Sequence, residues 1–73
     1  MTERHFAVSD TEYNLITTLS NLMQGEDALH QYIKDAKSSG DKDVESLFGE
    51  IHDANRDFAK RLREKLHDQF MNR

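Results

Sequence analysis

The sequence predicts an all-α fold, a two-helix antiparallel hairpin that pairs with a second copy of itself as a four-helix bundle. Apolar residues recur at spacings of three and four along most of the chain, which is the period of one helix face. The chain of 73 residues has no proline, and its only cluster of turn-forming residues, Ser38-Ser39-Gly40-Asp41, lies near the middle. The small size predicts the second copy, because so short a chain buries little apolar surface alone.

We expect residues 1–73 to form a single helical-hairpin domain. The first helix is predicted over about residues 10–38, the turn over residues 39–41 and the second helix over about residues 42–70. Each helix would then contain about 28 residues and measure roughly 42 Å.

The predicted helix ends follow from residues that satisfy free backbone groups. Ser9 and Glu12 have the spacing of a capping box, which places the start of the first helix at Asp10. Gly40 can adopt the left-handed conformation that ends a helix. Asp41 can accept a hydrogen bond from a free N–H group in the first turn of the second helix.

Each predicted helix carries an apolar stripe at alternating spacings of four and three. The stripe of the first helix comprises Leu15, Leu19, Leu22, Glu26, Leu29, Ile33 and Ala36. The stripe of the second helix comprises Val44, Phe48, Ile51, Asn55, Phe58 and Leu62, and it continues to Leu66 and Phe70. Flanking apolar residues make both faces wider than one neighbouring helix covers, which predicts four-helix packing. The predicted dimer core includes Leu22, Met23, Phe48 and Phe58.

One polar residue interrupts each stripe, Glu26 in the first helix and Asn55 in the second. A hairpin that turns at Gly40 brings the two residues to the same height, about halfway along the bundle. Two interpretations stay open: Glu26 forms a structural polar pair with Asn55, or it binds a metal ion together with His30 one turn later. We favour the polar pair. Burial is then expected to push the Glu26 carboxyl toward its protonated form, which would donate a hydrogen bond to the Asn55 oxygen.

Two glycines, Gly25 and Gly49, lie beside these stripes within the predicted helices. A glycine inside a helix costs about 1 kcal/mol relative to alanine. Either a close approach of two helices or room for a bulky neighbour would explain their presence.

A resemblance to one helical hairpin of ferritin-like proteins is carried by two segments, YNLITTLSNLMQGEDALHQYIKDA and VESLFGEIHDANRDFAKRLREKL. In iron-binding members, the resemblance implies, a mid-helix glutamate of the first helix and a Glu-x-x-His pair of the second bind metal. Glu26 matches the first element, whereas His52 has Gly49 in place of the paired glutamate. The resemblance therefore implies iron or another divalent metal as a candidate cofactor, without a complete di-iron centre or ferroxidase activity.

Composition argues against several other classes of protein. The formal net charge of -4 argues against nucleic-acid binding, and the absence of cysteine removes disulfides and thiolate sites. The sequence contains no run of about 18 apolar residues and no signal-peptide pattern, so we expect a cytoplasmic protein that does not insert into membranes. It also lacks a nucleophile paired with a base, a phosphate-binding loop and a zinc motif, so we do not expect an enzyme.

The sequence leaves two functions in competition. We favour a cytoplasmic interaction or scaffold protein that forms a homodimer and binds no cofactor, with a further protein as an additional partner. The alternative is a metal-binding half-bundle in which Glu26 is the core ligand.

Overall fold

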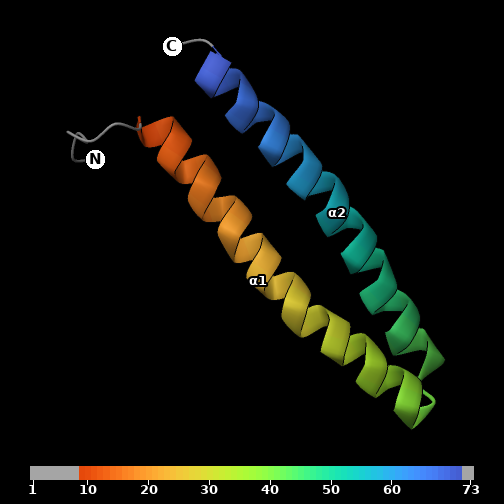
Figure 1. Cartoon of the computed structure of the whole chain (residues 1–73). Coiled ribbons are helices and arrows are strands. Elements are labelled where there is room, and N and C mark those ends of the chain that lie inside the picture. Colours follow the sequence, from red (N-terminus) through yellow and green to blue (C-terminus); the bar gives the residue numbers. More distant parts are fainter. Residues whose placement is uncertain (1–8, 72–73) are drawn as a thin grey trace.

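The computed structural model describes residues 9–71, which form two long helices joined by a short turn. Helix α1 spans Asp10–Ser39 and helix α2 spans Lys42–Met71, each with 30 residues. The helices run antiparallel and side by side, so the start of α1 and the end of α2 lie at the same end of the hairpin (Figure 1). No strand occurs within residues 9–71. The predicted all-α hairpin is therefore confirmed, and each helix ends one residue beyond its predicted end.

The start of α1 is fixed by a side-chain cap. Ser9 is the N-cap residue, and its Oγ accepts a hydrogen bond of 3.1 Å from the Glu12 backbone N–H. The same hydroxyl lies 3.4 Å from Glu12 Oε1, and Glu12 is buried. These contacts satisfy one of the free N–H groups of the first turn, as the capping-box spacing predicted.

The turn between the helices has the hydrogen bonds of a Schellman motif. Gly40 has a φ of 76°, in the left-handed region that glycine adopts without strain. Its N–H donates to the Lys37 carbonyl at 3.2 Å, and the Asp41 N–H donates to the Ala36 carbonyl at 3.0 Å. Asp41 Oδ1 then accepts a 3.2 Å hydrogen bond from the Val44 N–H. The predicted roles of Gly40 and Asp41 are confirmed.

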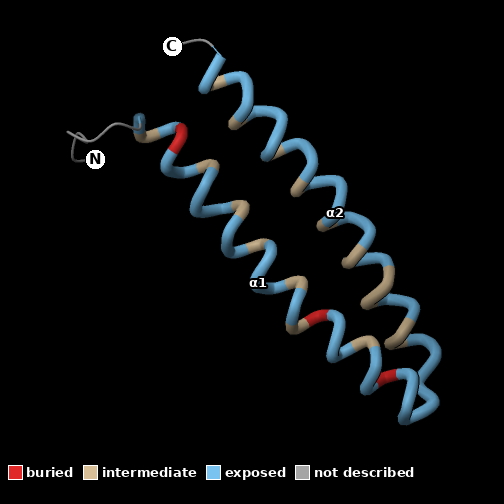
Figure 2. The backbone as a smooth tube through the Cα atoms, viewed as in Figure 1, coloured by how far each residue is buried: buried red, intermediate tan, exposed pale blue. Residues whose placement is uncertain are grey.

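Little of the hairpin is buried. Among the described residues the buried apolar side chains are Leu29 and Ala36, which are 7% and 6% exposed, and neither is fully inaccessible. Figure 2 shows the few buried positions, all on α1, and the larger set of half-buried positions along the facing sides of both helices. Every residue of the stripe predicted for α1 is buried or half-buried, and these residues are Leu15, Leu19, Leu22, Glu26, Leu29, Ile33 and Ala36.

The stripe predicted for α2 matches in part the side of this helix that faces α1. Its members Val44, Phe48, Asn55, Leu62 and Leu66 are half-buried. Ile51 and Phe58 are instead 40% and 50% exposed, and His52 and Ala59, outside the predicted stripe, are half-buried. The side that faces α1 therefore includes His52 beside Asn55, and both contact Glu26.

The two glycines inside the helices do not mark a close approach between α1 and α2. A Cβ atom added at Gly25 or Gly49 would meet nothing within 4 Å. The explanation by close approach is therefore wrong within the hairpin, and both positions border open space.

Candidate functional site

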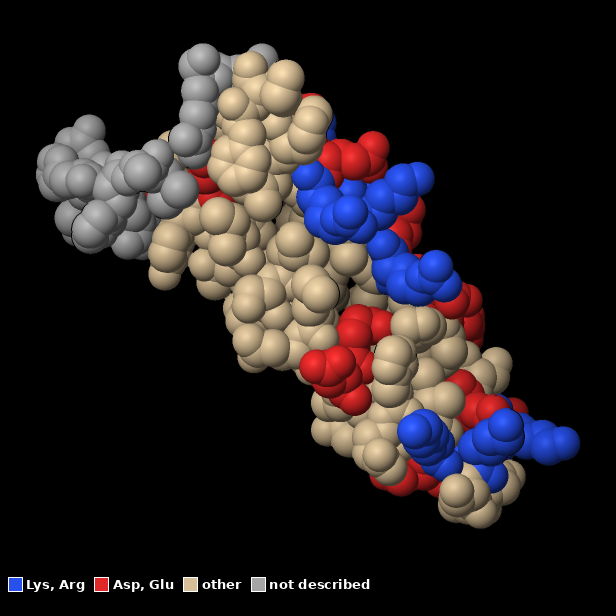
Figure 3. Space-filling model, viewed as in Figure 1, with Lys and Arg blue, Asp and Glu red and all other residues tan. Residues whose placement is uncertain are grey.

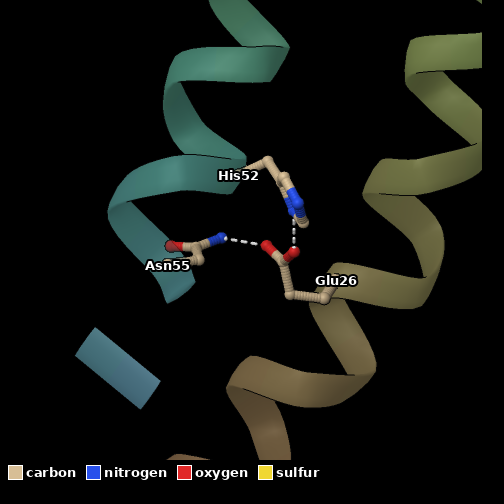
Figure 4. Close-up of polar contacts among 3 residues, drawn as sticks. All are labelled: Glu26, His52 and Asn55. Carbon is tan, nitrogen blue, oxygen red and sulfur yellow. Dashed lines mark hydrogen bonds and ion pairs between the residues drawn. The ribbon is translucent and has the colours of Figure 1, made fainter. Parts of the chain in front are cut away.

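A group of polar side chains lies halfway along the hairpin, between α1 and α2. Glu26 comes from α1, and His52 and Asn55 come from α2 (Figure 4). Asn55 Nδ2 donates a hydrogen bond of 2.8 Å to Glu26 Oε1. His52 Nδ1 contacts the other carboxylate oxygen, Oε2. Each oxygen of Glu26 thus has its own partner from the opposite helix.

The periodicity of the helices places these residues together. His52 and Asn55 are three residues apart, so they are neighbours on the same side of α2. Glu26 lies on the side of α1 that faces them, between Leu22 and Leu29 along its stripe. The Glu26 and His52 side chains are 16% and 26% exposed, so the contact is shielded from water but still open to it.

His30 extends this group on α1, one turn after Glu26. Its ring packs edge-to-face on the His52 ring, with centroids 5.0 Å apart and an interplanar angle of 63°. Glu26, His30 and His52 each offer one metal-ligating atom, and these three atoms lie within 4.8 Å of one another. We call Glu26, His30 and His52 the three-donor cluster, with Asn55 as its hydrogen-bonding neighbour.

The environment of Glu26 favours its ionised form. Burial raises the pKa of this carboxyl, but the hydrogen bonds from Asn55 and His52 and the nearby imidazoles of His52 and His30 together lower it below the ordinary 4.5. Our expectation of a protonated Glu26 that donates to Asn55 is therefore wrong. The Asn55 amide donates instead, and an ionised carboxylate only accepts.

Sequence reasoning named three of these four residues as site candidates and missed the fourth. Glu26 and Asn55 were found as polar interruptions of the stripes, and His30 was found by its spacing from Glu26. His52 was considered only as a partial match to Glu-x-x-His. A usable signal was its spacing of three from Asn55, which places both residues on one helix face.

A second feature is an apolar surface that the hairpin leaves uncovered. We define the exposed apolar face as Leu47, Ile51, Ala54 and Phe58, which recur at spacings of four and three along α2. Leu47 is 53% exposed, and Tyr32 of α1 is also exposed, with its ring centroid 6.2 Å from that of Phe48.

Of the four residues predicted for a dimer core, two lie between the helices of the hairpin and two are exposed. Leu22 and Phe48 are half-buried between the helices, whereas Met23 and Phe58 are exposed. On the side of the molecule drawn in Figure 3, Lys and Arg side chains gather along the outer edge of α2 and near the turn, acidic side chains lie in the middle, and uncharged surface separates them.

Comparisons with protein-family models, curated proteins and solved structures find no match to this chain. The resemblance to ferritin-like hairpins therefore stays a prediction. Within residues 9–71, neither helix combines the length and apolar character needed to cross a membrane.

Proposed function

We propose that this chain is a small interaction protein that acts as a homodimer. In this dimer the exposed apolar face of one hairpin packs against a second copy, and the four helices form a bundle of the ferritin-like kind. The observation that carries the proposal is the exposure of Leu47, Ile51 and Phe58 on one face of α2. A folded monomer seldom leaves so many large apolar side chains together in water.

The limited burial within the hairpin supports a second copy as the occupant of this face. Among the described residues, the two helices bury only Leu29, Ala36 and Glu12 between them, and one side of α2 stays uncovered. A second hairpin packed on that side would give α2 the second helical neighbour that a four-helix bundle provides.

The thin core of the single hairpin supports the same conclusion. Complete burial of a leucine, isoleucine or phenylalanine side chain contributes about 1.5 to 3 kcal/mol. Within the hairpin this contribution is nearly complete for Leu29 but only partial for Ile51 and Phe58. A twofold-symmetric dimer uses the same face of both copies, so each residue of that face contributes twice.

Sedimentation equilibrium of untagged, chelator-treated protein at micromolar concentration tests the proposal. We expect wild type to be a helical dimer. Phe58→Ala should weaken the dimer by about 3 to 5 kcal/mol if the ring is buried by the second copy. Met71→Ala is the matched control, because Met71 is also an exposed apolar residue of α2 but lies outside the exposed apolar face.

Two outcomes would contradict the proposal. One is a wild-type protein that is monomeric and fully helical at these concentrations, which would leave the face free for a different protein. The other is an equal effect of Phe58→Ala and Met71→Ala, which would show that the position of Phe58 has no special importance.

A further inference from the structure

The three-donor cluster has the composition of a metal site. It combines one carboxylate oxygen of Glu26 with one ring nitrogen each of His30 and His52, and these atoms lie within 4.8 Å of one another. Neighbouring ligands of a tetrahedral zinc ion, with bonds of about 2.0 to 2.1 Å, are about 3.3 Å apart. Side-chain rotations that move these atoms by roughly 1 Å would bring them to such distances.

The surroundings of Glu26 also suit a ligand. Carboxylates that bind metals are usually held in place by a hydrogen bond from a residue outside the coordination sphere. Asn55 provides such a bond to Oε1, while Oε2 points toward His52 (Figure 4). One oxygen is thus anchored, and the other faces the imidazole donor.

The cluster remains accessible to an ion from solvent. His30 is exposed and His52 is half-buried. An ion from solvent can therefore reach the cluster from the His30 side.

We propose that Glu26, His30 and His52 bind one divalent transition-metal ion within each hairpin. Two imidazoles and one carboxylate favour zinc, iron(II) and related ions over magnesium and calcium, which prefer oxygen ligands. This site is additional to the proposed homodimer, since all three donors belong to one chain.

His30 distinguishes a metal site from a purely structural contact. The hydrogen bonds of Glu26 go to His52 and Asn55 (Figure 4). His30 contributes a ring contact with His52 and a third donor atom. Replacement of His30 thus leaves the two hydrogen bonds of Glu26 in place and removes one donor, and a melt without zinc measures the loss of the ring contact.

Isothermal titration calorimetry with zinc chloride, on untagged protein stripped with a chelator and then desalted, is the test. We expect wild type to bind one zinc ion per chain and to melt at a higher temperature with zinc. His30→Gln and His52→Gln should each reduce the affinity at least tenfold. His67→Gln is the matched control, because His67 is an exposed histidine of α2 far from the cluster, and it should bind zinc like wild type. Magnesium chloride should give no binding.

Two further variants separate ligands from neighbours. Glu26→Gln should abolish binding while its circular dichroism stays helical, because a glutamine oxygen can still accept from Asn55. Asn55→Ala should retain one site per chain with an affinity reduced by about 10- to 100-fold, as for other residues that orient a ligand.

Absence of zinc binding to wild type would overturn the proposal. Zinc affinity like that of wild type in both the His30→Gln and the His52→Gln variant would overturn it too. So would a loss of zinc affinity in His67→Gln as large as the loss in these two variants. The oligomeric state is measured in chelator, so failure of this site leaves the proposed dimer unaffected, and a monomeric protein can still bind zinc.

Discussion

At the scale of single residues, Glu26 is defined by its partners. Its carboxylate lies between two apolar layers of α1 but accepts from an amide and an imidazole of α2. Desolvation and hydrogen bonding act in opposite directions on its charge, and here the hydrogen bonds and nearby imidazoles prevail. The Glu26 carboxylate therefore places a negative charge in the centre of the hairpin at neutral pH.

This charge makes the free energy of unfolding depend on pH. Folding holds the pKa of Glu26 below its ordinary value of 4.5, so its stabilising effect is fully present above that pH. The effect is lost as the pH falls below 4.5 and through the lowered value of the folded state. We expect wild type to lose more stability than Glu26→Gln over this range in urea denaturation. A difference between the two proteins that does not change with pH would show that Glu26 does not titrate in this way.

Replacement of Asn55 alone should lower the free energy of unfolding more than replacement of Glu26 and Asn55 together. Asn55→Leu removes the donor to Glu26 Oε1 and leaves a half-buried charge with one partner fewer, which should cost about 1 to 3 kcal/mol. The double change Glu26→Leu with Asn55→Leu replaces the polar pair by apolar contact and should recover this loss or exceed wild type. Chemical denaturation of both variants checks this order, and a double variant less stable than Asn55→Leu would contradict it.

At the scale of the helices, the sequence predicted α1 better than α2. The apolar period predicted the side of α1 that faces α2. Ser9 and Gly40 predicted the start and the end of α1. In α2 the same pattern correctly included half-buried residues such as Phe48 and Leu62, but it also included the exposed Ile51 and Phe58 and left out the half-buried His52. Periodicity shows that a side is apolar but does not say which neighbour covers it. The role of His52 was missed for this reason.

The three glycines should respond differently to replacement by alanine. Gly25 and Gly49 lie within helices, and an added Cβ meets nothing within 4 Å, so each change should stabilise the hairpin by up to about 1 kcal/mol. Gly40→Ala should destabilise it by roughly 1 to 2 kcal/mol, because the φ of 76° is strained for alanine. Denaturation in urea measures all three. Destabilisation by Gly25→Ala would indicate instead that a second copy occupies the space beside it.

At the scale of the whole molecule, the hairpin is long and thin, with extents of 51 × 21 × 16 Å. Few side chains of such a shape lie far from the surface, which fits the small number of buried residues. Large apolar side chains such as Leu47, Phe58 and Met71 are therefore left uncovered within the hairpin.

A homodimer of this kind should melt at a temperature that depends on protein concentration. Association stabilises the folded state by mass action, so the midpoint should rise as the concentration increases. Circular dichroism melts of wild type over a hundredfold range of concentration measure the effect, and Phe58→Ala should show a weaker dependence. A midpoint that is the same at all concentrations would contradict coupled folding and dimerisation.

The shared location of the two described helix ends determines how the hairpin would respond to mechanical load. A force that separates Asp10 from Met71 acts at the open end, and it parts the helices one turn at a time toward Gly40 (Figure 1). The load then falls on a few contacts at once, so the hairpin should unzip at low force rather than shear. The bonds of Glu26 to His52 and Asn55, halfway along this path, should appear in a pulling experiment as a pause that Glu26→Leu removes.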